Sequence, residues 1–153
     1  MIGLHDFLSV FLAVILGGMI GAEREMSGKA AGLRTNALIC LGAAVFTIIS
    51  KDMAAGTAEG SLTRIAAQIV TGVGFLGAGA IIQDRGGVHG LTTAATIWLV
   101  ASIGMACGAH FYGLAIATTL VAIAVLVLLG KLTRPLEEFG ARHKRNNAHN
   151  NPV

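Results

Sequence analysis

The sequence has 153 residues, of which 54% are hydrophobic and only 12% are charged, about half the charged share of a typical soluble domain. This composition excludes a soluble globular domain and favours an integral membrane protein, whose spanning helices need about 20 apolar residues each. The formal net charge of +3 does not indicate nucleic-acid binding, because five of the eleven Lys and Arg residues lie in one C-terminal segment, as in a membrane protein's tail.

Five apolar segments follow one another along the chain, and each can cross a membrane when its polar flanks reach the interface. We therefore predict an all-α integral membrane fold, a bundle of five transmembrane helices within residues 1–133. The predicted spans are 7–22, 35–50, 65–82, 91–108 and 111–130. The segment 134–153 is basic and then rich in Asn and His, without apolar periodicity, and is predicted to be a disordered cytoplasmic tail.

The Lys and Arg residues between the spans predict the orientation of the bundle. Lys51 and Arg64 fall on one side. The other nine fall on the opposite side: Arg24, Lys29, Arg34, Arg85, Lys131, Arg134, Arg142, Lys144 and Arg145. Because positive loops stay in the cytoplasm, we predict that the N-terminus is outside and the C-terminus is cytoplasmic.

Charged and polar residues gather where the first and third spans end and where the second and fourth begin. Charged groups that lie at the depth of the membrane usually face the interior of a helix bundle. The candidate binding cluster consists of Glu23, Arg24, Glu25, Arg34, Thr35, Asp84, Thr92 and Thr93. Two interpretations stay open: the cluster binds an ion, a phosphate-bearing ligand or a partner protein, or its members pair locally and anchor the helices at the interface.

The acidic members of this cluster are the residues that could bind a metal. Glu23, Glu25 and Asp84 carry the oxygen ligands that Mg²⁺ prefers, but the octahedral geometry that the ion demands is not visible in a sequence. Cys40 and Cys107 both fall within apolar segments, which indicates neither a disulfide framework nor a zinc site. We expect no resident cofactor and keep magnesium binding as an open hypothesis.

Glycines are concentrated in the third span, where Gly72 to Gly77 match the dinucleotide-binding pattern G-x-G-x-x-G. That pattern needs a preceding strand, whereas these glycines lie within an apolar run, so we interpret them as sites of close helix packing. The predicted packing residues are Gly17, Gly21, Gly72, Gly74, Gly77, Gly79, Gly104 and Gly108. They predict that the third span is the central helix, with the first and fourth spans as neighbours and the fifth facing lipid.

Arg64 and Gln68 are four residues apart on one face of the third span. They could form the outer entrance of a pathway along that span; alternatively, Arg64 reaches the headgroups and Gln68 bonds to a neighbouring helix. The sequence contains no phosphate-binding loop of the G-x-x-x-x-G-K-[ST] type and no H-E-x-x-H motif. We therefore expect that the protein is not an enzyme.

Four segments carry a family resemblance: Gly18–Glu25, Gly32–Asn36, Gly72–Gly79 and Gly90–Trp98. Together they resemble the MgtC/SapB family over roughly residues 12–108. The resemblance implies a five-helix protein of the bacterial inner membrane, associated with growth or survival under magnesium limitation and, in pathogens, with virulence. It also implies a regulator of other membrane machinery, including the F-type ATP synthase, rather than a pump.

The longer members of this family continue into a soluble C-terminal domain, whereas the present sequence ends in the short basic segment. We expect the role of the membrane bundle to carry over, which favours ion homeostasis or adaptation to magnesium limitation through a membrane partner. The alternative is an ion or small-solute transporter or channel with a pathway along the third span. Expected partners are the lipid bilayer, a membrane protein such as the F-type ATP synthase, and a second copy of the chain, but no nucleic acid.

Overall fold

The computed structural model describes the backbone of residues 3–54, 60–84 and 87–149, and the side chains of 3–54, 66–83 and 87–132. The elements are α1 (Leu4–Met26), α2 (Leu33–Ala54), α3 (Gly60–Gly79), β1 (Ile82–Asp84), β2 (Gly87–His89), α4 (Leu91–Gly108) and α5 (Tyr112–His149). Among the described residues, α1, α2, α4 and the Tyr112–Leu132 part of α5 are long and apolar enough to cross a membrane, and α3 contains a shorter apolar stretch, Ala66–Gly79. The predicted all-α membrane bundle is therefore confirmed.

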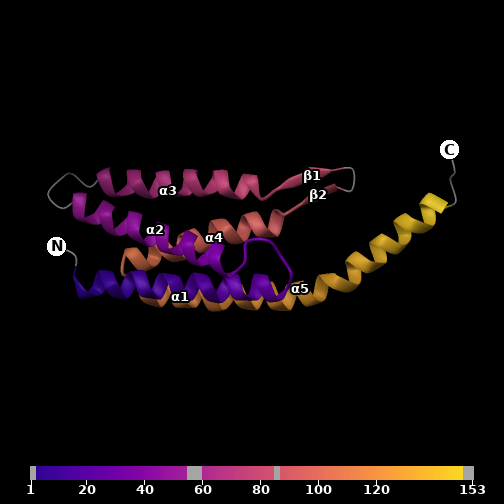
Figure 1. Cartoon of the computed structure of the whole chain (residues 1–153), viewed down its shortest axis with the longest axis horizontal. Coiled ribbons are helices and arrows are strands. Elements are labelled where there is room, and N and C mark those ends of the chain that lie inside the picture. The colour runs from indigo at the N-terminus through magenta and orange to yellow at the C-terminus, as the bar shows by residue number, and fades with distance from the viewer. Residues whose placement is uncertain (1–2, 55–59, 85–86, 150–153) are drawn as a thin grey trace.

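The helices form an up-and-down bundle in which α2 and α4 occupy the middle (Figure 1). On one side α1 and α5 lie next to each other, and on the other side α3 packs on α4 and α2. The third span is thus at the edge of the bundle and is not the central helix that its glycines predict. Small residues permit a close approach but do not compel one.

The glycines of α3 illustrate this difference. A methyl group at Gly72, Gly74 or Gly79 would meet nothing within 4 Å, and one at Gly77 would make ordinary contact with Ala94, 3.5 Å from its carbonyl oxygen. Gly72, Gly74 and Gly79 therefore leave an open face on α3, whereas the buried Gly77 packs against α4.

The closest helix contacts are made on α2. The glycines at these contacts are Gly17 and Gly21 of α1 and Gly104 and Gly108 of α4. A methyl group at Gly17 would stand 2.5 Å from Cβ of Cys40, and one at Gly104 would collide with the carbonyl oxygen of Cys40. Because α1 and α4 approach α2 through glycines, backbone lies against backbone on both sides of α2.

The main core fills the space between α1, α2, α4 and α5. Its buried residues are Ala13, Leu16, Ile20, Cys40, Ala44, Val100, Ile103, Cys107, Ala115 and Ala122. Cys40 and Cys107 are both free thiols within this cluster. The four helices therefore pack around an apolar core in the middle of the bundle.

The β1–β2 hairpin is an element that the sequence did not predict. The predicted third span runs to Ile82, but α3 ends at Gly79, and Gln83 of β1 pairs antiparallel with Val88 of β2. The apolar Ile81 prolongs the hydrophobic run without being helical. After the hairpin, Gly90 takes a φ of +88°, a conformation that glycine adopts without strain, and α4 begins at Leu91.

The fifth helix is longer than predicted. It continues to His149, through a segment for which the sequence predicts disorder from residue 134. That segment contains Glu, Ala, Arg and Lys, which have high helix propensity, and a lack of apolar periodicity argues only against packing on a core.

At the end of the bundle where α4 meets α5, polar side chains join three helices. Nε2 of His110 lies 3.1 Å from Oδ1 of Asp6 in α1, and its Nδ1 lies 3.2 Å from Nζ of Lys51 in α2. The Tyr112 hydroxyl lies 3.0 Å from the Ser9 hydroxyl. We call Asp6, Ser9, Lys51, His110 and Tyr112 the His110 cluster. Its contacts link the helices at one end of the bundle.

Candidate functional site

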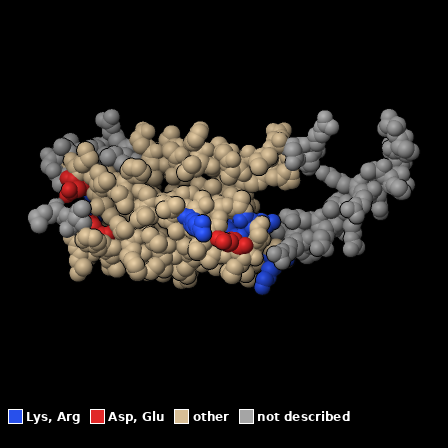
Figure 2. Space-filling model, viewed as in Figure 1, with Lys and Arg blue, Asp and Glu red and all other residues tan. Residues whose placement is uncertain are grey.

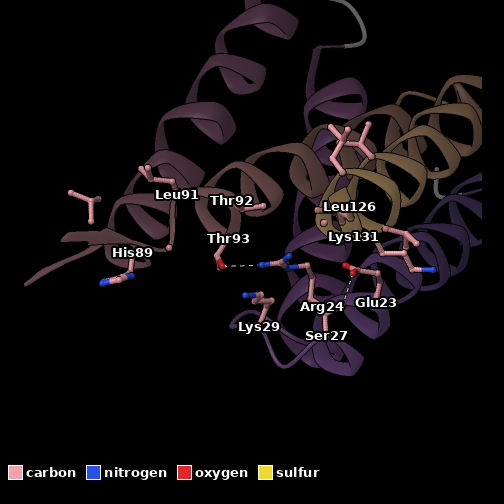
Figure 3. Close-up of a pocket in the computed structure, with 16 residues that line it drawn as sticks. Glu23, Arg24, Ser27, Lys29, His89, Leu91, Thr92, Thr93, Leu126 and Lys131 are labelled. Carbon is pink, nitrogen blue, oxygen red and sulfur yellow. Dashed lines mark hydrogen bonds between the residues drawn. The ribbon is translucent and has the colours of Figure 1, made fainter. Parts of the chain in front are cut away.

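A pocket of about 840 Å³ lies at the opposite end, between the end of α1, the start of α4 and the middle of α5 (Figure 3). Its polar lining residues are Glu23, Arg24, Ser27, Lys29, His89, Thr92, Thr93 and Lys131. On the α5 side its wall is apolar apart from Lys131 and includes Val125, Leu126 and Leu129. We call it the Arg24 pocket.

Arg24 is the buried cation of this pocket. Its side chain is only 5% exposed and extends from α1 toward Thr93 (Figure 3). A guanidinium nitrogen, Nη2, donates a hydrogen bond of 3.2 Å to Oγ1 of Thr93, which is itself buried. The Nε of Arg24 has no hydrogen-bond partner in the described part of the chain. Within the described side chains, this guanidinium has a neutral partner and no carboxylate partner.

Glu23 is the acidic residue of the pocket. It is 8% exposed, and its Oε1 accepts a hydrogen bond of 2.8 Å from the Ser27 hydroxyl, one helical turn further along the chain. Its Oε2 is buried and has no hydrogen-bond partner among the residues that the structure describes. Lys131 of α5 lies beyond Glu23 as seen from Arg24 (Figure 3). The two neighbouring charges of α1 therefore occupy different parts of the pocket.

Other members of the predicted cluster do not line the pocket. Glu25 is exposed, and its Oε2 accepts a hydrogen bond of 2.9 Å from the backbone N–H of Leu33 at the start of α2. Arg34 and Thr35 are exposed in the first turn of α2. The side chain of Asp84 lies outside the described residues. The structure thus brings together Glu23, Arg24, Thr92 and Thr93, and it gives Glu25 the local pairing role that was the second interpretation of the cluster.

The described carboxylates do not fit a magnesium site. Glu23 lines the pocket beside cations, whereas Glu25 bonds to the backbone of α2. The searched residues contain no group of three or more His, Cys, Asp or Glu side chains that could hold a metal ion. Oxygen ligands from several carboxylates would have to converge for a protein site of this ion.

Of the two predicted pathway residues, only Gln68 has a described side chain, and it does not line this pocket. The side chain of Arg64 lies outside the described residues. Gln68 is exposed and lines a separate groove of about 690 Å³ between α2 and α3, whose other lining residues are apolar or glycine. Gln68 is therefore a single polar group in an apolar groove.

The region that contains the pocket is similar to a known protein family. The model of the MgtC family matches residues 10–135, a range that includes every lining residue of the Arg24 pocket. The chain belongs to the MgtC family.

Two relatives give the extent of the similarity. Protein MgtC of Brucella abortus (strain 2308) is 48% identical over 125 residues, which cover 82% of this chain and 51% of the relative. Protein MgtC of Salmonella typhimurium (strain LT2) is 44% identical over 132 residues, which cover 86% of this chain and 55% of the relative. The chain spans about half the length of these curated relatives. No solved structure matches it significantly.

The charges of this MgtC-family bundle are distributed unevenly. Most Lys and Arg side chains in Figure 2 gather near the end where α1 stops and α2 starts. The described ones at this end are Arg24, Lys29, Arg34 and Lys131, and Lys51 lies at the other end in the His110 cluster. The Arg24 pocket is therefore at the basic end of the bundle.

Sequence reasoning missed several contributions to the pocket, among them Lys29. Ser27 pairs with Glu23, Lys131 comes from α5, and the apolar wall is formed by residues such as Leu126. The spacing of four residues between Glu23 and Ser27 on one helix face could have predicted their pairing. Nothing in the sequence indicates that α5, interpreted as a cover facing lipid, turns one face toward the ends of α1 and α4.

Proposed function

We propose that this protein acts in the bacterial inner membrane as a binding and regulatory protein, not as an enzyme, and that it supports ion homeostasis under magnesium limitation by acting on a membrane partner. The magnesium role is suggested by the family and by the name Protein MgtC of the relatives. The Arg24 pocket is the site that we assign to this function.

The observation that carries the proposal is a buried, incompletely paired Arg24 at one end of a bundle whose middle is apolar. A buried charge is costly and is usually kept for a function. Between this pocket and the His110 cluster lie Leu16, Val100 and Ile103, all buried. Such an arrangement favours binding at one end of the bundle over conduction through it.

We further propose that the basic end faces the cytoplasm, which places the N-terminus outside. The distribution of described Lys and Arg residues supports this orientation through the positive-inside rule. A partner such as the F-type ATP synthase would then meet the pocket from the cytoplasmic side or within the membrane. The open apolar face of α3 is compatible with a homodimer.

Two measurements test the function. In a bacterium lacking its own MgtC-family gene, the chain should restore growth at limiting magnesium. The same protein, purified into liposomes, should carry no magnesium, sodium or proton flux above that of empty liposomes. Flux that Glu23→Ala abolishes would replace this proposal with the transporter alternative, and a failure to restore growth at wild-type membrane levels would remove the magnesium role.

A further inference from the structure

The Arg24 pocket contains a cation that lacks a counter-charge among the described side chains. Arg24 is only 5% exposed. Among the described residues its Nε has no hydrogen-bond partner, and its one side-chain hydrogen bond goes to the neutral Thr93. A buried guanidinium ordinarily pairs with a carboxylate or a phosphate, because desolvation without an opposite charge is unfavourable. The planar guanidinium also has donors left over for a ligand.

The start of α4 faces the same pocket and adds further donors. Its N-cap is Gly90, which has no side chain to cap the helix, and the first backbone bond of the helix runs from the Ala94 N–H to the Gly90 carbonyl, 2.9 Å. The N–H groups of residues 91–93 therefore precede the hydrogen-bonded ladder. Leu91, Thr92 and Thr93 all line the pocket. A helix N-terminus carries a partial positive charge and is a common site for phosphate groups.

The remaining charges of the pocket also favour an anion. Lys29 lies close to the Arg24 guanidinium in Figure 3, and Lys131 lines the α5 side. Among the lining residues Glu23 is the one carboxylate, and Ser27 already bonds to one of its oxygens. The cationic side chains of the lining therefore outnumber the acidic ones.

The apolar wall indicates what the anion is attached to. Val125 is 47% exposed and Leu129 is 52% exposed on the α5 side of the pocket, in the part of α5 that is apolar enough to cross a membrane. Acyl chains can lie along such a surface while a headgroup reaches the cations at the interface. A volume of about 840 Å³ accommodates a headgroup.

We propose that the Arg24 pocket binds a phosphate group, held by Arg24, Thr93 and the N-terminus of α4, with Lys29 at its rim. The phosphate comes from an anionic phospholipid or from free phosphate. The proposed function assigns the regulatory role to this pocket, and the phosphate proposal names the class of ligand that binds there. The phosphate proposal rests on the proposed function only in the choice of site. Because binding is measured on purified protein and the function by growth, either can fail without the other.

The test is native mass spectrometry of the purified full chain in neutral detergent. One arm adds phosphatidylglycerol, a second adds phosphatidylcholine, which has a phosphate but no net charge, and a third adds inorganic phosphate as a competitor. Wild type should retain phosphatidylglycerol in preference to phosphatidylcholine. If inorganic phosphate displaces phosphatidylglycerol, the phosphate itself is the recognised group. If inorganic phosphate binds and the protein shows no preference between the two lipids, free phosphate is the source.

Variants localise the binding. Arg24→Gln should weaken it about tenfold or more, because one charge-assisted hydrogen bond contributes that much. Lys29→Gln, an exposed position that does not endanger folding, should weaken it several-fold. Arg34→Gln removes a cation at the same end but outside the pocket and should bind like wild type. Equal retention of the two lipids without binding of inorganic phosphate, or unchanged binding in both Arg24→Gln and Lys29→Gln, would overturn the proposal.

Discussion

Arg24 in α1 and Thr93 in α4 meet through their side chains although 69 positions separate them in the sequence. The bond of 3.2 Å joins the end of one helix to the first turn of another, and both residues are buried. This hydrogen bond lies in the pocket to which we assign the function, and single substitutions can test it.

Replacing Thr93 with Val should destabilise the bundle. The substitution keeps the shape of the side chain but removes the acceptor of the Arg24 hydrogen bond, which should cost about 1–3 kcal/mol for a buried donor left unsatisfied. Thr93→Ser retains the hydroxyl and should lie near wild type. The exposed Thr92→Val is the matched control and should change stability by less than about 0.5 kcal/mol. Thermal unfolding in detergent measures all three; equal effects of Thr92→Val and Thr93→Val would show that the bond contributes nothing.

The glycines of α4 and α3 should respond differently to the same change. Gly104→Ala places a methyl group against the carbonyl of Cys40 and should destabilise by about 1–3 kcal/mol or more, because backbone has to move. Gly74→Ala adds its methyl group in open space and should be neutral or stabilising by up to about 1 kcal/mol. Unfolding midpoints of the two variants check this. A larger loss of stability in Gly74→Ala than in Gly104→Ala would contradict this prediction, because it would place α3 in a contact that this bundle does not contain.

His110 should contribute to stability at the opposite end. His110→Ala removes the contacts to Asp6 and Lys51, and it puts Ala at a φ of +67°, a left-handed conformation that His tolerates better. We expect a loss of about 1–2 kcal/mol, since the contacts are partly exposed. His5→Ala is the control, because the His5 carbonyl, not its ring, accepts the hydrogen bonds from Ser9 and Tyr112. Similar losses in both variants would mean that the tilted contact between the His5 and His110 rings, 6.0 Å between centroids, matters more than the polar contacts.

The proposed orientation predicts which end of the bundle is accessible from outside the cell. Ala30, between α1 and α2, and Phe111, between α4 and α5, are both exposed and lie at opposite ends. A membrane-impermeant thiol reagent should label Phe111→Cys in intact cells and Ala30→Cys only after permeabilisation. The native thiols, Cys40 and Cys107, are buried and should give little background. The reverse labelling would place the Arg24 pocket outside.

Much of the fold was predictable from the sequence because long apolar runs with few charges have one common solution in a membrane, the spanning helix. The end of α3 was not, because Ile81 and Ile82 continue the apolar run after the helix stops at Gly79. Nor was the arrangement of the helices. Glycines such as Gly74 and Gly104 look alike in a sequence, and only the packed structure shows which of them meets another backbone.

The candidate site was predictable in part for the same reasons. Glu23 and Thr93 fall at helix ends that an up-and-down bundle must place at the same membrane face. Arg34 falls there too, but the rotation of α2 about its own axis decides that it is exposed outside the pocket. That rotation depends on the contacts of glycines such as Gly21 with the start of α2, which no pattern of residue types reveals.

The role of the Arg24 pocket is tested by growth at limiting magnesium. The strain used lacks its MgtC-family gene and carries variants of this chain at equal membrane levels. We expect that wild type and Arg34→Gln restore growth and that Arg24→Gln does not. Arg24→Lys, which keeps the charge but loses the planar donors, should restore it partly. Full restoration by Arg24→Gln would contradict the assignment of the function to the Arg24 pocket.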